Sequence, residues 1–535
     1  MKRLIKFLIF PCLFLMASAC TDLEEVLKGD ITNDISLPGL DTGGGGAGGD
    51  VLEAAFSRLR GTGTANHGSY YSVQTITSDE QCIAAKGGDW FDGGILIELH
   101  RHTYAPNHAF INNTWNDHYG AINTCNEFLQ RSDLDANALA QVRVLRAYFY
   151  MRLMDMFGRV KIVTQPGVDA PQVSRQMVFN FVESEILNAL DISAVSQGMD
   201  LSNSPLGSAP NPYRINIYGA LGILAKVYLN AEVWTGTAMY DKAAIAAGYV
   251  IDSGAYALCG DGCRVPNLGR RPAVASDPAD LEGYAAVFAP NNANNQEHIF
   301  VVFYDEARAG GMNFAKMNLH YSSQFTYNFQ AQPWNGYATL EEFYNSYADG
   351  DARKAANFLV GPQLDFGGSA VLDYASDSGD LQLNYTPRIN ELAPNSLRQA
   401  GARPAKFSYK QLGRPDQDND YPIVRLGELY LIRAEAMARH TGNWNNAIPD
   451  VNIIRARAKV PAYTSLNADE FIRERGREMF QEGLRRTDLI RFGKYNDSWW
   501  EKPASQPFRN VFPIPQQQII ASSGSANPLT QNTGY

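Results

Sequence analysis

The feature that most constrains the fold is a short pattern between two periodic segments near the C-terminus. In LYLIRAEAMARHTGNWNNAIPDVNIIRARA, residues 429–458, one helical segment ends near Gly442, Trp444 follows, and Ala447 comes three residues after the tryptophan. Glycine permits a tight turn, an aromatic ring fills the gap between two helices, and alanine lets the helices approach closely. The pattern therefore predicts two antiparallel helices packed as a tetratricopeptide-like hairpin.

A second hairpin of the same kind is predicted much earlier in the chain. In ALGILAKVYLNAEVWTGTAMYDKAAIAAGYVI, Tyr240 and Ala243 take the aromatic and small positions, and Ala238 replaces the glycine. Because the two hairpins are far apart in the sequence, their repeats do not form a regular array.

Apolar periodicity predicts several more helices. In ALAQVRVLRAYFYMRLMDMFG, apolar residues recur at steps of three and four, and Gly158 is placed to end the helix. Similar segments cover residues 115–130, 176–190, 216–232, 241–252, 425–440, 445–458 and 468–492, and the clearest strand signal is HIFVVFY at 298–304.

The segment 253–415 has a different composition, rich in Gly, Asn, Pro and aromatic residues. Long loops on a rigid frame often carry binding sites. The predicted fold is therefore mainly α, an α-α superhelix of tetratricopeptide-like hairpins with a long loop-rich insertion. Residues 51–535 are expected to form one body, with a helical scaffold at about 51–252 and 416–535 and a ligand-binding portion at about 253–415.

The first residues have the layout of an export signal. Lys2, Arg3 and Lys6 precede an apolar run that is far shorter than the roughly 20 residues needed to span a bilayer. We expect residues 1–19 to be a signal peptide.

Two processing routes fit the end of this signal. Small residues directly before Cys20 suit lipoprotein signal peptidase, which would leave Cys20 lipidated as a membrane anchor. Ala17-Ser18-Ala19 is also an A-x-A site for the ordinary signal peptidase, which would release the chain without an anchor. The glycine-rich DTGGGGAGGD, at 41–50, indicates a flexible tether. With lipidation at Cys20, residues 20–50 are expected to form a lipidated N-terminus and this tether.

Charge and cysteine content narrow the function classes. The formal net charge is −10, whereas nucleic-acid binders carry a basic surface. Nucleic-acid binding is therefore not expected. Cys259-Gly-Asp-Gly-Cys263 can close a small disulfide loop, although two free or separately paired thiols, with Cys82 and Cys125 as further candidates, fit the sequence equally. A zinc site would need a second pair of ligands nearby, which the sequence lacks.

Several segments together resemble one protein family. They are VRVLRAYFYMRLMDMFG, LAKVYLNAEVW, AAGYVIDSGAY, NDYPIVRLGELYLIRAEAMAR, REMFQEGLRRTDLIRFG and VFPIPQQQIIASSGSANPLTQNTGY. In this order, after a lipoprotein-type start, they resemble the SusD/RagB family of outer-membrane nutrient-binding lipoproteins. The chain ends in Asn532-Thr533-Gly534-Tyr535, which is similar to the family's usual Asn-Pro-Gly-Tyr with Thr533 in place of proline.

This resemblance implies a location, a partner and a ligand class. Such proteins are lipid-anchored on the outer face of the outer membrane and cap a SusC-like TonB-dependent transporter. They capture oligosaccharides, or in some members peptides, for import. The resemblance also implies that Asp22, Glu24 and Glu25, after Cys20, form an acidic surface-export signal; a solvated charged leader is the alternative.

An oligosaccharide is held by aromatic rings stacked on its sugars, with amides and carboxylates bonded to its hydroxyls. Two loop segments have this composition: SDEQCIAAKGGDWFDGG and NLHYSSQFTYNFQAQPWNGY. The candidate ligand-binding residues are Asp79, Asp89, Trp90, Tyr321, Trp334 and Asn335, with Glu80, Asp92 and Tyr327 beside them. For each ring the alternative is packing within the loop's own small core, and Trp444 is expected to be core because of its place in the hairpin.

Charged residues elsewhere offer other chemistries. In RERGREMFQEGLRRTDLIR, alternating arginines would keep Glu478 and Glu482 ionised, which indicates a structural ion-pair network rather than acid/base catalysis. The network would include Arg485, Arg486, Asp488 and Arg491.

Metal binding is considered at two places. Glu98, His100 and His102 would share one face if their segment is extended. Asp416, Asp418 and Asp420 alternate in DQDND and could form a loose calcium site, which lacks the glycine and glutamate of an EF-hand.

The sequence as a whole predicts a surface glycan-binding lipoprotein that acts as the lid of a TonB-dependent importer. No G-x-S-x-G, H-E-x-x-H or phosphate-binding glycine loop is present, and neither catalysis nor a cofactor is expected. Three alternatives stay open: peptide cargo for the same lid, a glycoside hydrolase with two carboxylates, and a purely structural surface protein.

Overall fold

The computed structural model describes residues 51–375 and 381–535. The predicted signal peptide at 1–19, the lipidation site at Cys20 and the tether at 20–50 lie outside these residues. Val51–Tyr535 form one compact unit. In the described ranges, none of the helices combines the length and apolar character that crossing a bilayer requires.

The fold is mainly helical, which confirms the predicted class. The longer helices are α5 (Ala109–Leu129), α6 (Ala136–Phe157), α7 (Arg175–Leu190), α8 (Ile217–Leu229), α10 (Tyr240–Asp252), α16 (Leu426–Thr441), α17 (Ile448–Arg457) and α18 (Ala468–Met479). The shorter ones are α1 (Glu53–Phe56), α2 (Arg58–Gly61), α3 (Tyr70–Thr75), α4 (Ile95–Arg101), α9 (Ala231–Thr235), α11 (Tyr284–Val287), α12 (Phe314–Asn318), α13 (Ser323–Tyr327), α14 (Glu341–Asn345), α15 (Ala352–Asn357), α19 (Arg485–Arg491) and α20 (Gln516–Ser522). Single 3₁₀ turns are η1 (Asp92–Gly94), η2 (Trp444–Ala447) and η3 (Pro507–Asn510).

The strands are short and pair two by two in antiparallel fashion within the described residues. The pairs are β1 (Gln81–Cys82) with β7 (Ala338–Thr339), β2 (Val160–Lys161) with β3 (Gln172–Val173), β4 (Arg264–Pro266) with β5 (Asp280–Glu282), β6 (His298–Val302) with β12 (Tyr421–Arg425), β8 (Phe358–Leu359) with β11 (Arg403–Pro404), and β9 (Gly361–Pro362) with β10 (Asn384–Tyr385). The strand predicted at 298–304 is β6.

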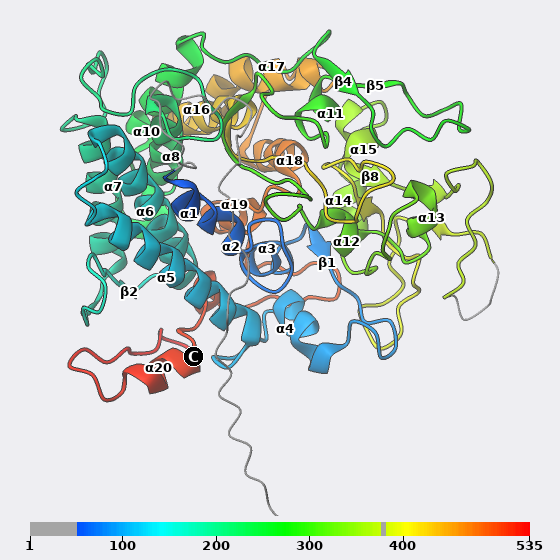
Figure 1. Ribbon diagram of the computed structural model, residues 1–535, viewed down its shortest axis with the longest axis horizontal. Helices are drawn as coiled ribbons and strands as arrows, with labels where there is room; N and C mark the ends of the chain where they lie inside the picture. The colour runs from blue at the N-terminus through cyan, green and yellow to red at the C-terminus, as the bar shows by residue number, and fades with distance from the viewer. Residues whose placement is uncertain (1–50, 376–380) are drawn as a thin grey trace, which may run out of the picture. The chain divides into compact units, whose positions relative to one another are not determined.

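Several long helices gather on one side of this unit, and the short helices of the insertion gather on the other (Figure 1). Helix α6 packs between α5 and α7, and α10 packs against both α8 and α16, at the left of the view. The short helices α11 to α15 lie at the right. The insertion therefore sits beside a helical frame.

Both predicted hairpins are present. Helix α16 ends at Thr441 with Gly442 in the left-handed region at φ 69°, and η2 leads the chain back into α17. Ala447 is fully buried, and the Trp444 ring packs against Phe471 and Phe492 at centroid distances of 5.2 and 5.7 Å. Trp444, which was predicted to be core, is half-buried and packs against the hairpin's core cluster.

Side-chain caps fix where several helices begin. A polar residue just before each helix accepts a hydrogen bond from a backbone N–H in the first turn, which satisfies a donor that the helix itself cannot. These caps are Asp135 for α6, Ser174 for α7, Asn216 for α8 and Asn467 for α18.

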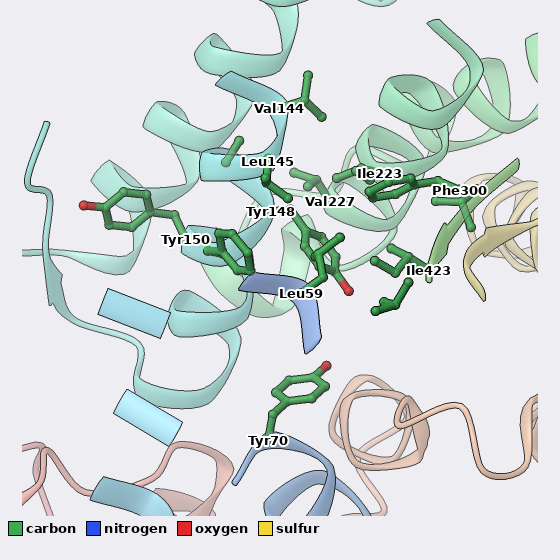
Figure 2. Close-up of a cluster of buried hydrophobic side chains, with 14 of the residues drawn as sticks. Leu59, Tyr70, Val144, Leu145, Tyr148, Tyr150, Ile223, Val227, Phe300 and Ile423 are labelled. Carbon is green, nitrogen blue, oxygen red and sulfur yellow. The ribbon is translucent and has the colours of Figure 1, made fainter. Parts of the chain in front are cut away.

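The main core joins the helices to the β6–β12 pair (Figure 2). Leu145 from α6, Ile223 and Val227 from α8, Phe300 from β6 and Ile423 from β12 are all buried in it. Because β6 lies within the insertion and β12 follows it in sequence, this core ties the insertion to the helical frame.

A close approach of α8 to β12 makes one glycine necessary. A Cβ atom added at Gly222 would lie 2.3 Å from Cγ1 of Val424. We therefore expect Gly222→Ala to lower the free energy of unfolding by about 1–3 kcal/mol in urea denaturation, because the helix must move off the strand. Gly120→Ala in α5 is the matched control: its Cβ would meet no described atom within 4 Å, and alanine is expected to stabilise that helix by about 0.5–1 kcal/mol. Equal stability of Gly222→Ala and wild type would contradict the close packing.

The helix predicted at 468–492 is wrong in its middle. Helix α18 ends at Met479 and α19 starts at Arg485, and between them Gln481 and Gly483 have φ values of 63° and 67°. The N–H of Gln481 donates to Oε1 of Glu80 at 2.8 Å. A tertiary contact thus replaces the helical hydrogen bond that the periodic pattern predicted. The segment predicted at 216–232 is likewise two helices, α8 and α9, that meet at Asn230.

Residues 51–108 differ from the helical scaffold predicted for them. They form only short elements, and β1 pairs with β7 through the register Gln81 to Thr339. Helices α1, α2 and α3 contact α5, so this segment touches both the helical frame and the insertion.

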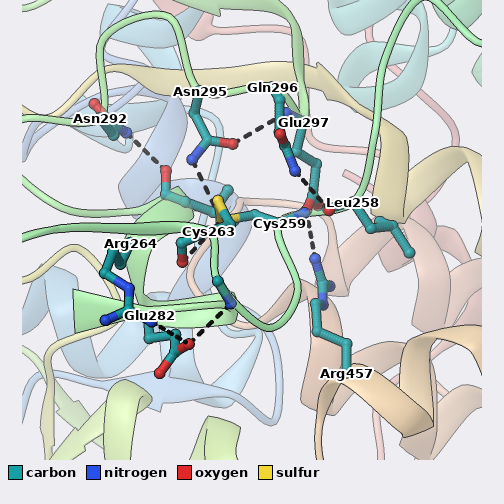
Figure 3. Close-up of a disulfide and its surroundings, with 12 residues drawn as sticks. Leu258, Cys259, Cys263, Arg264, Glu282, Asn292, Asn295, Gln296, Glu297 and Arg457 are labelled. Atoms are coloured by element: carbon teal, nitrogen blue, oxygen red, sulfur yellow. Dashed lines mark hydrogen bonds and ion pairs between the residues drawn. A yellow bond between two sulfur atoms is a disulfide. The ribbon is translucent and has the colours of Figure 1, made fainter. Parts of the chain in front are cut away.

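Cys259 and Cys263 form a disulfide, which decides between the two alternatives that the sequence left open (Figure 3). The N–H of Cys259 donates to Oε2 of Glu297 at 3.2 Å, and the N–H of Gly262 donates to Oε1 of Glu282 at 2.9 Å. The small loop is thus tied to the start of β6 and to β5.

Candidate ligand-binding site

Three loops meet around Trp334. They are residues 86–94 between β1 and α4, residues 328–337 between α13 and β7, and residues 393–398 ahead of β11. A backbone bridge pairs Lys86 with Asn395, and the indole N–H of Trp90 donates to the carbonyl of Trp334 at 2.6 Å. The two aromatic segments that the sequence singled out therefore do come together.

The backbone of Trp334 is held on both sides while its ring stays accessible. Its N–H donates to the carbonyl of Lys316 in α12 at 2.7 Å, and its carbonyl accepts from Trp90. The Lys316 ammonium lies 4.6 Å from the ring centroid, a cation–π distance. Trp334 is 37% exposed. A fixed, partly bare indole is a platform on which the apolar face of a sugar ring can stack.

Asn335 supports the Trp334 loop through its buried side chain. Its backbone is left-handed at φ 60°, and its side chain is fully buried. Its Nδ2 donates to the carbonyl of Arg398 at 3.0 Å, and its Oδ1 accepts from Nη2 of Arg403 at 2.7 Å. Since both ends of the amide are engaged, the expected hydroxyl contact is not available at Asn335.

Trp90 supports the Trp334 loop, and little of its ring is open to the stacking that the sequence predicted for it. It is only 9% exposed, and the His67 ring meets it edge-on at 5.2 Å. A Cβ at Gly336 would lie 2.7 Å from Cζ2 of Trp90, so the indole is pressed against the backbone after Trp334. The burial of Trp90 fixes the loop that presents Trp334.

Polar and apolar groups near Trp90 are open to solvent. Asp89 and Asp92 are exposed, and the ring of Phe91 is 46% exposed. Burial raises the pKa of Asp89 while the Lys86 ammonium opposes that rise. These carboxylates can accept hydrogen bonds from hydroxyl groups. Sequence reasoning missed Phe91, which lies between two residues with positive φ, Trp90 and Asp92.

Two other candidates, Asp79 and Tyr321, share no hydrogen bond, ion pair or ring contact with Trp334 in the described part of the chain. Asp79 accepts from Nε and Nη2 of Arg485 at 2.7 and 2.8 Å, and it lines a hollow of about 310 Å³ with Phe343 and Trp499. Tyr321 is half-buried, and within the described residues its hydroxyl has no hydrogen-bond partner. Asp79 is thus a structural ion-pair member.

Further hollows are lined by other residues. One of about 490 Å³ includes Tyr347, Tyr463 and Arg473, and one of about 320 Å³ includes Arg271 and Tyr327. The Trp334 ring is a surface platform and does not line either of these hollows.

The considered metal ligands do not converge. His100 bonds the carbonyl of Trp500 and His102 bonds that of Thr77, and burial lowers both pKa values, that of His100 to about 4. Across the described ranges, no group of three His, Cys, Asp or Glu side chains could hold a metal ion.

The aspartates of DQDND have separate partners. Asp416 pairs with Arg414, Asp418 with Lys410, and Asp420 accepts from the hydroxyl of Tyr213 at 2.9 Å. They do not form the loose calcium site that their alternation had indicated.

The predicted ion-pair network is present and structural. Its members are buried, but most partners come from outside the run: Glu478 and Glu482 pair with Arg425, Arg485 with Asp79 and Arg486 with Asp155, whereas Asp488 pairs with Arg475 and Arg491 of the run itself. Burial opposes ionisation of Glu478, but Arg457, Arg425 and Arg353 lower its pKa to about 2. Glu478 is therefore ionised and unsuited to act as a general acid.

The chain is a mainly helical protein in which loops present a partly exposed aromatic ring. Known proteins match it in sequence and in fold. Residues 296–535 match the model of the SusD family. The starch-binding protein SusD of Bacteroides thetaiotaomicron is 26% identical, over 77% of this chain and 76% of its own length.

Solved structures show the same fold. A SusD superfamily protein from Parabacteroides distasonis aligns with a TM-score of 0.67 at 18% identity, over 90% of this chain and 98% of its own. Surface glycan-binding protein A from Bacteroides thetaiotaomicron in complex with laminarihexaose aligns with a TM-score of 0.64 at 19% identity, over 90% and 98%. The chain is thus similar to SusD/RagB proteins, in sequence at residues 296–535 and in fold over 90% of its length.

Proposed function

We propose that this protein captures an oligosaccharide at the cell surface, with Trp334 as the stacking platform, and delivers it to a SusC-like TonB-dependent transporter. The observation that carries the proposal is the partly exposed Trp334 indole, held rigid by the hydrogen bonds of its own backbone to Trp90 and Lys316. A preorganised ring loses little conformational entropy when a ligand binds.

The relatives support the ligand class. One relative is named for starch binding, and a structural neighbour was solved with laminarihexaose. The exposed Asp89 and Asp92 beside the platform supply acceptors for sugar hydroxyls. In this proposal the protein binds without hydrolysing, and Cys20 anchors it by lipid to the outer face of the outer membrane.

The test is affinity electrophoresis of residues 21–535 in gels that contain starch, laminarin or other neutral polysaccharides. We expect retardation by at least one polysaccharide and a loss of affinity of about 10- to 100-fold in Trp334→Ala, which corresponds to about 1.4–2.8 kcal/mol. Trp334→Phe keeps a ring and should lose less. Ile520→Ala, an exposed apolar residue of α20, is the control that should not change retardation.

Other outcomes separate the alternatives. Release of short sugars from the polymer would make the protein a hydrolase, and retention of peptides alone would change the cargo. Unchanged affinity in Trp334→Ala would remove the platform from the site. For the partner, full-length protein extracted in detergent should carry an outer-membrane barrel protein with it, and Cys20→Ala should release the chain from the membrane.

A further inference from the structure

Phe325 and Tyr374 form an exposed aromatic pair in the insertion, separate from Trp334. Their rings meet edge to face at a centroid distance of 6.3 Å, and they are 53% and 52% exposed. Rings that pack together normally do so to leave water, but here half of each remains open. Leu372 and Leu381, 48% and 55% exposed, complete the group that we name the Phe325 patch.

The backbone explains why these side chains face solvent. The N–H of Asp373 donates to the carbonyl of Leu381 at 2.7 Å, and the N–H of Leu383 donates to that of Val371 at 2.8 Å, so two segments pair as extended chain. Val371 and Leu383 are buried, as the alternation of extended chain requires.

On the outer face of this pairing the usual pattern is reversed. Alternation puts Leu372, Tyr374 and Leu381 outward, where a sheet with one wet face normally carries polar residues. Contiguous exposed apolar side chains of this kind mark interaction sites.

The patch sits on a stable base. Phe325 belongs to α13, where the hydroxyls of Ser323 and Tyr385 lie 2.7 Å apart. The carbonyl of Phe325 accepts from the N–H of Phe366 at 3.0 Å. The Phe325 ring is therefore presented by a fixed backbone, as Trp334 is.

One continuous stretch of chain joins the patch to Trp334. Phe325 and Trp334 are nine residues apart, so they lie within about 30 Å of each other. Between them Asn328, Gln330 and Gln332 are exposed and offer amide donors and acceptors.

A second segment borders this stretch. The N–H of Leu412 donates to the carbonyl of Tyr327 and the N–H of Gln330 to that of Gly413, both at 3.0 Å. Leu412 is 57% exposed, so the apolar surface continues beside the amides.

The absence of charged residues from this stretch favours a neutral ligand. The chain is 19% charged, yet residues 321–340 contain no charged residue and carry instead aromatic rings, glutamines and asparagines. Side chains without formal charge make no ion pair with a ligand, but they can stack on rings and bond hydroxyls. A protein partner would gain from charges around an apolar centre, which this stretch lacks.

We propose that the Phe325 patch is a second stacking subsite for the same glycan chain, and that the protein recognises an extended neutral polysaccharide that spans Trp334 and the patch. This inference rests on the proposed function. Two platforms that one polymer can reach raise the affinity for a long chain by multivalency, while a short oligosaccharide reaches only one of them.

The experiment compares long and short forms of the same ligand by isothermal titration. The probes are laminarin with laminaritriose, and soluble starch with maltotriose. We expect Phe325→Ala/Tyr374→Ala to lower the affinity for the polymer about 10-fold and to leave the trisaccharide affinity within twofold of wild type. Trp334→Ala should lower both. The control Met437→Ala/Ile453→Ala removes exposed apolar side chains from α16 and α17 and should change neither.

The remaining outcomes distinguish the two proposals. If Trp334→Ala weakens binding but Phe325→Ala/Tyr374→Ala binds the polymer like wild type, the second subsite is wrong and the platform stands. If the wild type binds none of these probes or the neutral polysaccharides of the gel panel, both proposals fail. Equal losses for polymer and trisaccharide in the double variant would also overturn the two-platform model, and circular dichroism checks that the variant is folded.

Discussion

Arg425→Met is expected to lower the free energy of unfolding by about 3–5 kcal/mol, more than any surface substitution in this chain. Arg425 ends β12 and is fully buried. Its Nη1 donates to Glu297 and Glu478, each at 2.9 Å, and its Nε and Nη2 donate to Glu482 at 2.8 and 2.7 Å. Methionine fills similar volume but leaves three buried carboxylates without their shared cation.

The remaining cations cannot replace Arg425. Arg457 already bridges Glu297 and Glu478, and Lys406 already donates to Glu482 at 2.5 Å. Three carboxylates around one fewer positive charge repel one another in a medium that screens them poorly. Arg425→Met should therefore unfold at lower urea concentration, with an unchanged slope if the native state stays compact.

Two further variants keep this expectation open to contradiction. Arg131→Ala removes an exposed ion pair with Asp133 and should leave the urea midpoint unchanged. Adding Glu482→Gln to Arg425→Met should recover part of the loss, because one of the stranded charges is gone. If Arg425→Met and Arg131→Ala unfold at the same urea midpoint, the ion-pair network does not hold β12 in place.

The helical frame was predictable because its signals are local. Gly158 and Gly442 both adopt positive φ values just after a periodic segment, and the pattern around Trp444 gave the hairpin without knowledge of the rest of the chain. The glycine near the end of the chain also has a nearby cause. A Cβ at Gly534 would lie 2.4 Å from Cγ of Phe508, so only glycine fits at this position.

The break between α18 and α19 was not predictable because its cause is distant in sequence. Periodicity at 468–492 is satisfied by one long helix. The chain turns at Gln481 because its N–H meets Glu80, which lies 401 residues away. Propensity is a weak prior, and such a contact overrides it.

The roles of the aromatic residues were only half predictable. Composition selected both Trp90 and Trp334, yet nothing in either segment distinguishes the exposed ring from the buried one. The difference comes from a hydrogen bond between residues 244 positions apart. Likewise Asn335 reads as a ligand-binding amide until Arg403, 68 residues away, is seen to occupy its oxygen.

Acid should destabilise this protein steeply below pH 4.5. Burial alone would raise the pKa of Glu474, but Arg353, Arg477 and Arg455 lower it to about 2, and the pKa of Glu478 is lowered to about 2 in the same way. Both folded pKa values lie below the unfolded value near 4.5. Their stabilisation is therefore complete above pH 4.5 and is lost as the pH falls toward 2.

Between pH 7 and 4.5 the buried histidines and the buried neutral carboxyl groups change the free energy of unfolding in opposite directions. Burial lowers the pKa of His100 and His298 to about 4, so the unfolded state takes up their protons first, and stability falls as the pH drops below 6.5. Burial raises the pKa of Glu80 and Asp420 to about 7, so the folded state takes up their protons first, and stability rises over the same window. We expect a shallow dependence there and a steep one below.

Glu474→Gln isolates one of the carboxylates responsible. A shift from 4.5 to about 2 corresponds to on the order of 3 kcal/mol, because one pKa unit is about 1.4 kcal/mol. The variant should be less stable than wild type in urea at pH 7, and the gap should close as the pH falls from 4.5 toward 2, since the wild-type Glu474 then becomes neutral too. Asp349→Asn on the exposed surface is the matched control, with a curve parallel to wild type at every pH. If the Glu474→Gln curve also stays parallel to wild type below pH 4.5, Glu474 is not held ionised by its arginines and the acid transition has another origin.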